Sequence, residues 1–342
     1  MGVSKSIVDG IALIKHQYNK KQSDKRISYM NASKKNIWSY FPITFLTALF
    51  CCILWGSASP AIKIAYEIFK IPPDDTASRI MLAGARFLLA GAMTIVFGSI
   101  ISRKILIPQK GSLKYIASLS LLQTVGQYFF FFMSLAYISG VKGSIINASG
   151  NFLAIIIAAA IFRLEKLTVR KISGCIVGFS GIILILGGVK ALFDGSNITF
   201  QGEGAMLMAA MFFAFSSCVI KIFSKYENPV ILSGYQFMFG GLILFIIGLV
   251  MGGHLYFYSS SCVYNLIYMG FISAGAYTLW GVLLKHNPVS RISIFGFINP
   301  VMGVMLSALF LGENKEAFSI TGLIALLLVV AGIVIVNTGK TA

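Results

Sequence analysis

The sequence predicts an all-α integral membrane protein, with ten transmembrane helices arranged as two inverted five-helix repeats. Three observations lead to this fold class: the composition, the length of the apolar blocks and an internal repeat. Hydrophobic residues make up 57% of the 342 residues and charged residues only 11%, whereas about a quarter of an average soluble domain is charged. A chain with so few charges cannot cover a globule with polar surface, so we expect lipid to solvate most of it.

The apolar blocks are close to the ~20 residues that a helix needs to cross a ~30 Å hydrocarbon core. Helices are favoured over barrel strands because each helix satisfies its own backbone hydrogen bonds in lipid, and the short alternating pattern of barrel strands is absent. The expected spans are residues 43–66, 79–100, 113–136, 140–162, 170–188, 204–224, 229–251, 262–284, 291–311 and 317–337.

Positive charge indicates the orientation. Most of the 28 Lys and Arg residues lie in the N-terminal arm and in the loops after the even-numbered spans. Basic residues accumulate on the cytoplasmic side of membrane proteins, so we expect both termini in the cytoplasm and the chain in the cell (inner or plasma) membrane. The net charge of +17 is explained by this bias without a nucleic-acid partner.

The N-terminal arm, residues 1–42, has two interpretations. Ile7, Ile11 and Ile14 recur at helical spacing beside several lysines, as in a helix that lies on an anionic leaflet. Alternatively, the chain starts at Met30, which opens a short basic segment directly before the first span.

Two parts of the chain align with one another and predict a first unit over 43–190 and a second over 203–337. Because each unit has an odd number of spans, the second enters the membrane from the opposite side. Inverted repeats are typical of secondary transporters, which open a midplane site to either side in turn. The matches pair "SPAIKI" at Ser59 with "SCVIKI" at Ser217, "GARFLLAG" at Gly84 with "GYQFMFGG" at Gly234, Gly126 with Gly275, and "NFLAIIIAAAIFRLEK" at Asn151 with "NPVMGVMLSALFLGEN" at Asn299.

The motifs "LWGSASPAIK", "ARF", "EKLTVRKISGCIVGFSGIILI" and "NPVMGVMLSALFLGE" also carry a family resemblance. With them, the chain resembles the EamA-type branch of the drug/metabolite transporter superfamily over residues 43–337. The resemblance implies a ten-helix basket around a central cavity, and export of small metabolites or drugs without ATP. The copies differ in two places: Phe213-Ala214 replaces Trp55-Gly56, and Asn299-Pro300 replaces Asn151-Phe152.

Arg86 is a charge within the second span, ~10 Å deep at 1.5 Å per residue. A charge at a helix centre costs ~2.5–3.5 kcal/mol on insertion scales, so such residues usually face the bundle interior. Its repeat mate, Gln236, is also polar. Arg86 either attracts a carboxylate or other anionic group of the substrate, or bonds helix-end carbonyls and holds spans together. We favour the structural or gating role, because an arginine here resembles a general feature of a family whose members carry unlike substrates.

Other polar and aromatic residues within the spans are candidates for the cavity wall. The alternative for each is packing or hydrogen bonding between helices. Asn299 precedes Pro300, whose missing N–H is expected to free a carbonyl in mid-helix. Besides Arg86 and Gln236, the substrate-binding candidates are Trp55, Gln123, Gln127, Asn147, Asn151, Tyr277, Trp280 and Asn299.

Small residues predict close helix contacts. Gly174 and Gly178 form a GxxxG motif on the fifth span, and Gly303 with Ser307 repeats the small-xxx-small pattern on the ninth. An alternative role of the fifth and tenth spans is an interface between two copies, which would make the protein a homodimer.

The function predicted is a secondary transporter, an exporter of an amino-acid-like or other small organic solute, or of a drug, by alternating access. Its expected partners are that solute, the lipid bilayer, and a coupling ion (proton or sodium) or counter-solute. Drug-cation efflux within the same fold is the first alternative, but no Asp or Glu lies at the centre of a span. Glu67, the nearest acid, predicts an i,i+4 ion pair with Lys63 at a span end. A membrane receptor or scaffold without transport is the second alternative, and it does not account for the inverted repeat.

Catalysis, metal binding and a cofactor are not expected. The histidines lie outside the expected bilayer core, and the sequence contains neither HExxH nor GxSxG. The five cysteines lack CxxC and Cys/His spacing.

Overall fold

The computed structural model describes residues 37–164, 166–188, 198–287, 292 and 294–338. The two interpretations of the N-terminal arm fall on residues 1–36, outside the described residues. Contacts divide the chain into a unit of residues Met1–Thr44 and a unit of residues Phe45–Ala342. Within the first unit, the Thr44 hydroxyl donates hydrogen bonds to the carbonyl oxygens of Trp38 and Tyr40, at 2.9 and 3.1 Å.

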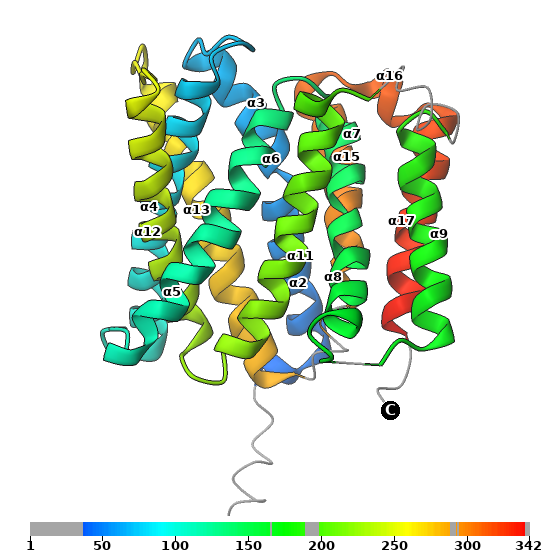
Figure 1. The fold of residues 1–342 in the computed structure, drawn as a ribbon, viewed down its shortest axis with the longest axis horizontal. Coiled ribbons are helices and arrows are strands. Elements are labelled where there is room, and N and C mark those ends of the chain that lie inside the picture. The colour runs from blue at the N-terminus through cyan, green and yellow to red at the C-terminus, as the bar shows by residue number, and fades with distance from the viewer. Residues whose placement is uncertain (1–36, 165, 189–197, 288–291, 293, 339–342) are drawn as a thin grey trace, which may run out of the picture. The chain divides into compact units, whose positions relative to one another are not determined.

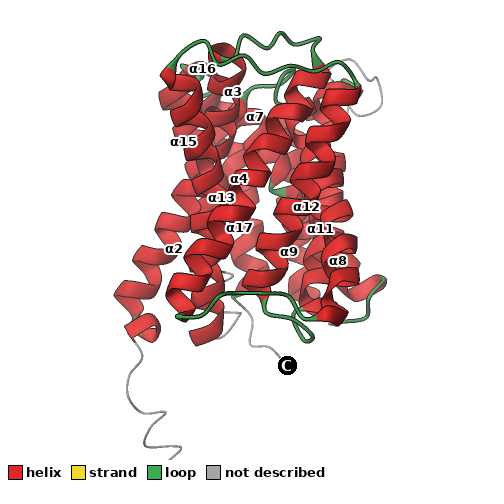
Figure 2. Ribbon diagram, turned by 90° about the vertical axis from the view of Figure 1, so that its left-hand side faces the viewer, coloured by secondary structure: helices red, strands yellow, loops and turns green. Residues whose placement is uncertain are grey.

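All regular structure among the described residues is helical, and loops join the helices at both ends (Figure 2). The N-terminal half, taken here as residues 45–188, contains α2 (Phe41–Gly56, which begins in the first unit), α3 (Ala58–Ile68), α4 (Thr76–Ser102), η2 (Lys110–Ser112), α5 (Leu113–Leu119), η3 (Ser120–Gln127), α6 (Tyr128–Ser134), α7 (Gly140–Asn147), α8 (Ser149–Ala160) and α9 (Val169–Ile185). The C-terminal half, residues 198–338, contains η4 (Phe200–Gly204), α11 (Ala205–Phe223), α12 (Pro229–Val250), α13 (Ser260–His286), η5 (Ile294–Phe297), α15 (Ile298–Leu311), α16 (Asn314–Ala317) and α17 (Ile320–Asn337).

Eight helical segments among the described residues are long and apolar enough to cross a membrane. The spans expected at 170–188 and 291–311 correspond to shorter helices: α9 has 17 residues, and η5 with α15 forms an apolar helix over Phe295–Leu311. Helix α9 begins at Val169, where Thr168 caps it by accepting a hydrogen bond from the Lys171 N–H, and it ends at Ile185, before the expected end at residue 188.

Several spans are interrupted. The helix breaks between α2 and α3 at Ser57, one turn before Pro60, whose ring removes the N–H that would bond the Gly56 carbonyl. The fourth span breaks at Ala148, between α7 and α8. Pro300 is the third residue of α15, directly after η5, so the N–H that it lacks falls where the 3₁₀ turn passes into the α-helix.

Large apolar side chains lie on the outer faces of the helices, while several polar side chains are buried together with the apolar core. On α4, Val96 and Ile100 are exposed while Arg86 and Thr94 are buried. On α12, Gln236 is fully buried and Leu249 is exposed. A water-soluble protein rarely exposes so many large apolar side chains on neighbouring helices, so this arrangement suits helices surrounded by lipid.

The longest helix contact joins the two halves and pairs α4 with α12 (Figure 1). Glycines permit it. A Cβ built on Gly84 would lie 2.8 Å from the Gly241 carbonyl oxygen, and one built on Gly91 would lie 2.6 Å from the Gly234 carbonyl oxygen. Side chains at these positions would push the two backbones apart.

Helices α9 and α17 form a second pair between the halves (Figure 1). A Cβ on Gly332 would lie 2.7 Å from the Gly174 carbonyl oxygen and from the Gly178 backbone. A Cβ on Gly303 would meet the Ser144 hydroxyl at 2.5 Å. The close helix contacts predicted from the small-residue motifs are therefore confirmed within one chain.

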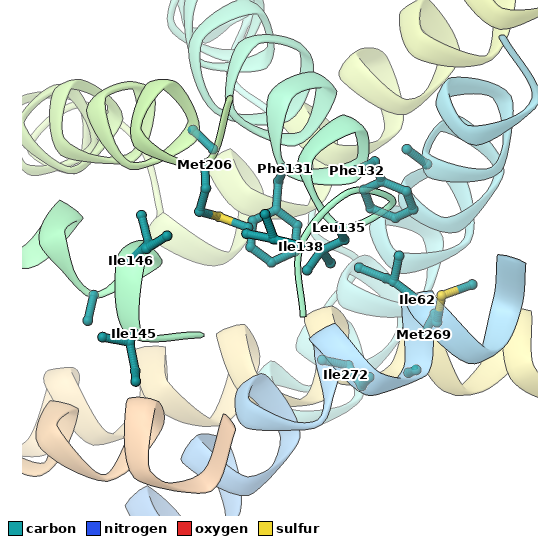
Figure 3. Close-up of a cluster of buried hydrophobic side chains, with 14 of the residues drawn as sticks. Ile62, Phe131, Phe132, Leu135, Ile138, Ile145, Ile146, Met206, Met269 and Ile272 are labelled. Carbon is teal, nitrogen blue, oxygen red and sulfur yellow. The ribbon is translucent and has the colours of Figure 1, made fainter. Parts of the chain in front are cut away.

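The main apolar core draws on both halves. Figure 3 shows Ile62 and Phe132 of the N-terminal half near Met269 and Ile272 of the C-terminal half, and all four are fully buried. This core holds α3, α6 and α13 together beside the polar residues considered next.

Candidate functional site

Arg86 is buried and attaches α4 to α13. Its Nε donates to the Met269 carbonyl oxygen at 3.2 Å, and its Nη2 donates to the Ser273 hydroxyl at 3.2 Å. Its Nη1 is buried without a hydrogen-bond partner. The guanidinium carbon lies 5.0 Å from the Phe87 ring centre and 5.9 Å from the Tyr128 ring centre, close enough for cation–π attraction. An unpaired buried donor costs ~1–3 kcal/mol, so Nη1 is a group that a ligand oxygen would stabilise.

Gln236, the repeat mate of Arg86, attaches α12 to η3. Its Nε2 donates to Gln123 Oε1 at 2.9 Å, and its Oε1 accepts from the Thr124 hydroxyl at 2.5 Å. Gln123 Nε2 in turn donates to the Tyr277 hydroxyl at 3.4 Å. Gln123 and Thr124 lie in η3, a π-helical turn, and such turns are frequent at functional sites.

An aromatic chain connects these polar groups with Trp55. The Trp55 ring meets Tyr277 edge-on at 5.5 Å between centroids and Trp280 at 5.1 Å. Tyr277 meets Phe237 at 5.1 Å, and Phe237 meets Phe87, the neighbour of Arg86, at 5.3 Å. The structure therefore brings together six of the predicted site residues, namely Trp55, Arg86, Gln123, Gln236, Tyr277 and Trp280, which we call the interhalf cluster.

Among the described residues, the other four candidates form no hydrogen bond or ring contact with this cluster. Gln127 is buried and its Oε1 has no hydrogen-bond partner. Asn147 and Asn151 lie on either side of the α7–α8 break, and Asn151 is exposed while its Nδ2 donates to the Ala148 carbonyl at 3.2 Å. Asn299 is half-buried in the first turn of α15.

Sequence reasoning missed Thr124 and Ser273. A signal for them was present: the alignment of Gly126 with Gly275 also places Thr124 opposite Ser273. Serine and threonine are common within membrane spans, so the sequence does not single out these two residues. Their hydrogen bonds to Gln236 and Arg86 do.

Charged contacts join the two halves at the end of the bundle that holds α16. The Glu313 carboxylate accepts hydrogen bonds from the backbone N–H groups of Gly140 and Val141, at 3.0 and 2.9 Å. It also forms an ion pair with Lys63 at 3.7 Å. The expected ion pair between Lys63 and Glu67 is not found among the described residues, because the Lys63 ammonium reaches Glu313 and donates to the Ile138 carbonyl instead.

The Glu203 carboxylate forms further contacts at the same end of the bundle. Lys142 and Glu203 form a short ion pair between α7 and η4, and Glu203 also accepts from the Thr199 N–H at 3.0 Å. The Ser134 hydroxyl donates to the Gly202 carbonyl at 2.7 Å. We call the contacts of Glu313 and Glu203 the α16-end latch.

Glu227 joins the halves at the opposite end. Its Oε2 accepts from the Gln109 N–H at 2.9 Å, and its Oε1 accepts from the Asn228 N–H at 2.8 Å. Burial favours the neutral acid, but these N–H groups and the Ser112 hydroxyl favour the carboxylate more, and the pKa of Glu227 falls below its ordinary value.

Apolar outer faces, buried polar groups and eight long apolar helices among the described residues define a multi-pass membrane protein. The EamA-like transporter family model matches residues 42–187 and again residues 200–338, so the chain belongs to this family. The resemblance seen in the motifs is thereby confirmed.

Individual relatives are distant in sequence. A WAT1-related chloroplastic protein of Arabidopsis thaliana is 26% identical over 277 residues, and the match covers 78% of this chain but 64% of that protein. A Salmonella typhimurium protein named "probable amino-acid metabolite efflux pump" is 24% identical, with 84% and 92% of the two chains covered. An uncharacterized transporter of Archaeoglobus fulgidus is 27% identical, with 78% and 90% covered. One solved crystal structure shares the fold, with a TM-score of 0.58, 16% identity, and 85% and 95% of the two chains covered.

Proposed function

We propose that this chain is a secondary transporter that exports a small, amino-acid-like organic solute by alternating access between its two halves. Membership of a transporter family and the name of the Salmonella relative support export of a small metabolite. In this proposal α9 and the η5–α15 segment also span the bilayer, which makes ten spans. The distribution of loop charges supports cytoplasmic termini, and the proposal includes a location in the cell membrane.

Helix pairing supports an inverted repeat. Equivalent helices pair with one another, α4 with α12 and α9 with α17, and α3 packs on α13 as α11 packs on α6. The glycine contacts between α4 and α12 follow the same symmetry. Gly84 aligns with Gly234 and Gly91 with Gly241, and the contacts join Gly84 to Gly241 and Gly91 to Gly234. Such reciprocal contacts are those of a two-fold axis.

The observation that carries the proposal is a reciprocal polar contact at the boundary of the halves. Arg86 of α4 bonds the Ser273 hydroxyl of α13, and its mate Gln236 of α12 bonds the Thr124 hydroxyl of η3. Ser273 and Thr124 are themselves repeat mates. If the halves exchange conformations, each polar pair can take the place of the other, and a site between them is kept in both states.

The interhalf cluster offers the groups that an amino-acid-like solute requires. The unpaired Nη1 of Arg86 would donate to a carboxylate oxygen, while the two nitrogens that bond α13 keep the guanidinium in place. Trp55 and Trp280, both only half-buried, supply ring faces for the apolar part of the solute. Gln127, Asn147, Asn151 and Asn299 remain candidates for a wider cavity wall.

The α16-end latch would be the closed external gate. It joins α7 and α3 of one half to Glu313 of the other, and Lys142 to Glu203. Opening this end would expose both carboxylates to water and release the α7 N–H groups. Alternating access therefore requires a rearrangement that these contacts oppose.

Transport is tested with purified protein in liposomes loaded with labelled amino acids, organic acids or cationic dyes. We expect saturable efflux of at least one amino acid without ATP, driven by a proton gradient, a sodium gradient or counter-solute. Protein-free liposomes control for leakage. No flux across the whole panel, with the protein shown to be folded by its thermal unfolding, would contradict the proposal, and selective flux of cationic dyes would favour drug-cation efflux.

A further inference from the structure

An apolar groove runs along the outward face of α8 and α9, apart from the interhalf cluster. It has a volume of about 430 Å³ and is lined by Ile156, Leu167, Ile172, Ile176, Phe179 and Ser180 among others. Ile176 is 64% exposed. Its α9 residues, at positions 172, 175, 176, 179, 180 and 183, repeat the three- and four-residue spacing of one helix face, so the groove follows the helix axis and has the form that an extended hydrocarbon chain fills.

Basic residues gather at one end of this groove. Arg163, Lys166 and Arg170 are exposed and lie within four residues of Leu167 along the chain, and Leu167 lines the groove. The Lys171 ammonium donates to the Lys166 carbonyl at 3.4 Å. With one acid, Glu165, in the same stretch, the segment keeps a positive net charge. An apolar groove that ends in a positive cluster matches a ligand with an acyl chain and an anionic head.

We propose that this groove binds an anionic phospholipid, with an acyl chain along α9 and the phosphate beside Arg163, Lys166 and Arg170. Basic pockets beside membrane helices bind anionic head groups, and each Lys or Arg near the head adds to the attraction. Charge complementarity favours this occupant over a second copy of the chain, because a two-fold dimer through the groove would bring the two basic clusters close together.

The site is tested on the full-length protein in neutral detergent, with native mass spectrometry counting bound lipid. Phosphatidylglycerol and phosphatidylcholine with identical acyl chains are the probes. We expect tighter binding of phosphatidylglycerol, and an advantage that shrinks as salt is raised. The triple variant Arg163→Gln, Lys166→Gln, Arg170→Gln should weaken phosphatidylglycerol binding about tenfold or more.

A matched triple variant removes the same number of charges from the loop after α4. Arg103→Gln, Lys104→Gln, Lys110→Gln should leave the affinity for phosphatidylglycerol unchanged, since these exposed residues do not flank the groove. Ser180→Phe fills the groove and should weaken both lipids. Thermal unfolding of each variant shows that it is folded, and the salt series on the unaltered chain tests the charge without any substitution.

Three results would overturn the lipid site. They are equal binding of the two lipids, equal losses in both triple variants, and a dimer that forms through the groove and excludes lipid. None of these results bears on solute transport, so the lipid site and the proposed function succeed or fail separately.

Discussion

Substituting Gly84 by alanine tests whether the two halves depend on a close crossing of α4 and α12. The new Cβ would lie 2.6 Å from the Phe245 Cα and 2.8 Å from the Gly241 carbonyl oxygen, and closer still to the Phe245 amide nitrogen. These are backbone atoms, so no side-chain rotation relieves the overlap. Overpacking costs ~1–3 kcal/mol, and the helix-propensity gain of ~1 kcal/mol offsets part of it. We expect a net loss of roughly 2 kcal/mol, because backbone overlap belongs at the upper end of that range.

Thermal unfolding of the purified protein in detergent measures this loss. Gly281→Ala is the matched control on α13, since its Cβ would lie 3.7 Å from the Val230 side chain, an ordinary contact. The control should be as stable as the unaltered protein or more stable, because alanine favours the helix. Gly241→Ala should resemble Gly84→Ala, as its Cβ would lie 2.6 Å from the Leu88 amide nitrogen. A Gly84→Ala protein that unfolds at the same temperature as the Gly281→Ala control would refute the reasoning.

Three further predictions concern charged residues. Arg86→Gln should abolish export of carboxylate-bearing solutes and spare neutral ones in the liposome assay, whereas an equal loss for all solutes would assign Arg86 a purely structural role. Glu313→Gln should lower the thermal stability by roughly 1.5–3 kcal/mol, the contribution of a charged hydrogen bond. Glu316→Gln, in the short helix α16 that follows Glu313, should change little, and equal effects would contradict the latch. Because its folded pKa is lowered, Glu227 adds stability above the unfolded pKa of about 4.3, and that stability is lost as pH falls through the folded pKa. The stability difference between the unaltered protein and Glu227→Gln should therefore vanish in acid, and a difference independent of pH would contradict this assignment.

Much of the helical organisation follows from the sequence because lipid imposes simple constraints. Apolar blocks of sufficient length must form helices, and the small-residue motifs at Gly174 and Gly303 predicted close helix contacts that the structure contains. The alignment of Arg86 with Gln236 likewise predicted two related polar positions within the spans, and both side chains are buried in the structure.

Other features depend on three-dimensional neighbours and could not be read from spacing. The i,i+4 rule assigned Lys63 to Glu67, but the fold brings Glu313 and the Ile138 carbonyl within reach of its ammonium group. The fourth span, expected as one helix over residues 140–162, divides at Ala148 into α7 and α8. The sequence around Lys63 and around Ala148 does not specify these outcomes, because packing between distant spans sets them.

Counterflow in proteoliposomes tests alternating access most directly. Labelled solute outside is mixed with liposomes that contain a high concentration of the same solute, unlabelled, with no ion gradient. A carrier that exposes its site to one side at a time should accumulate label transiently above equilibrium, and Gly281→Ala should do the same. Label that equilibrates without overshoot would indicate a channel, absence of uptake would indicate a receptor or scaffold, and either result would contradict the account.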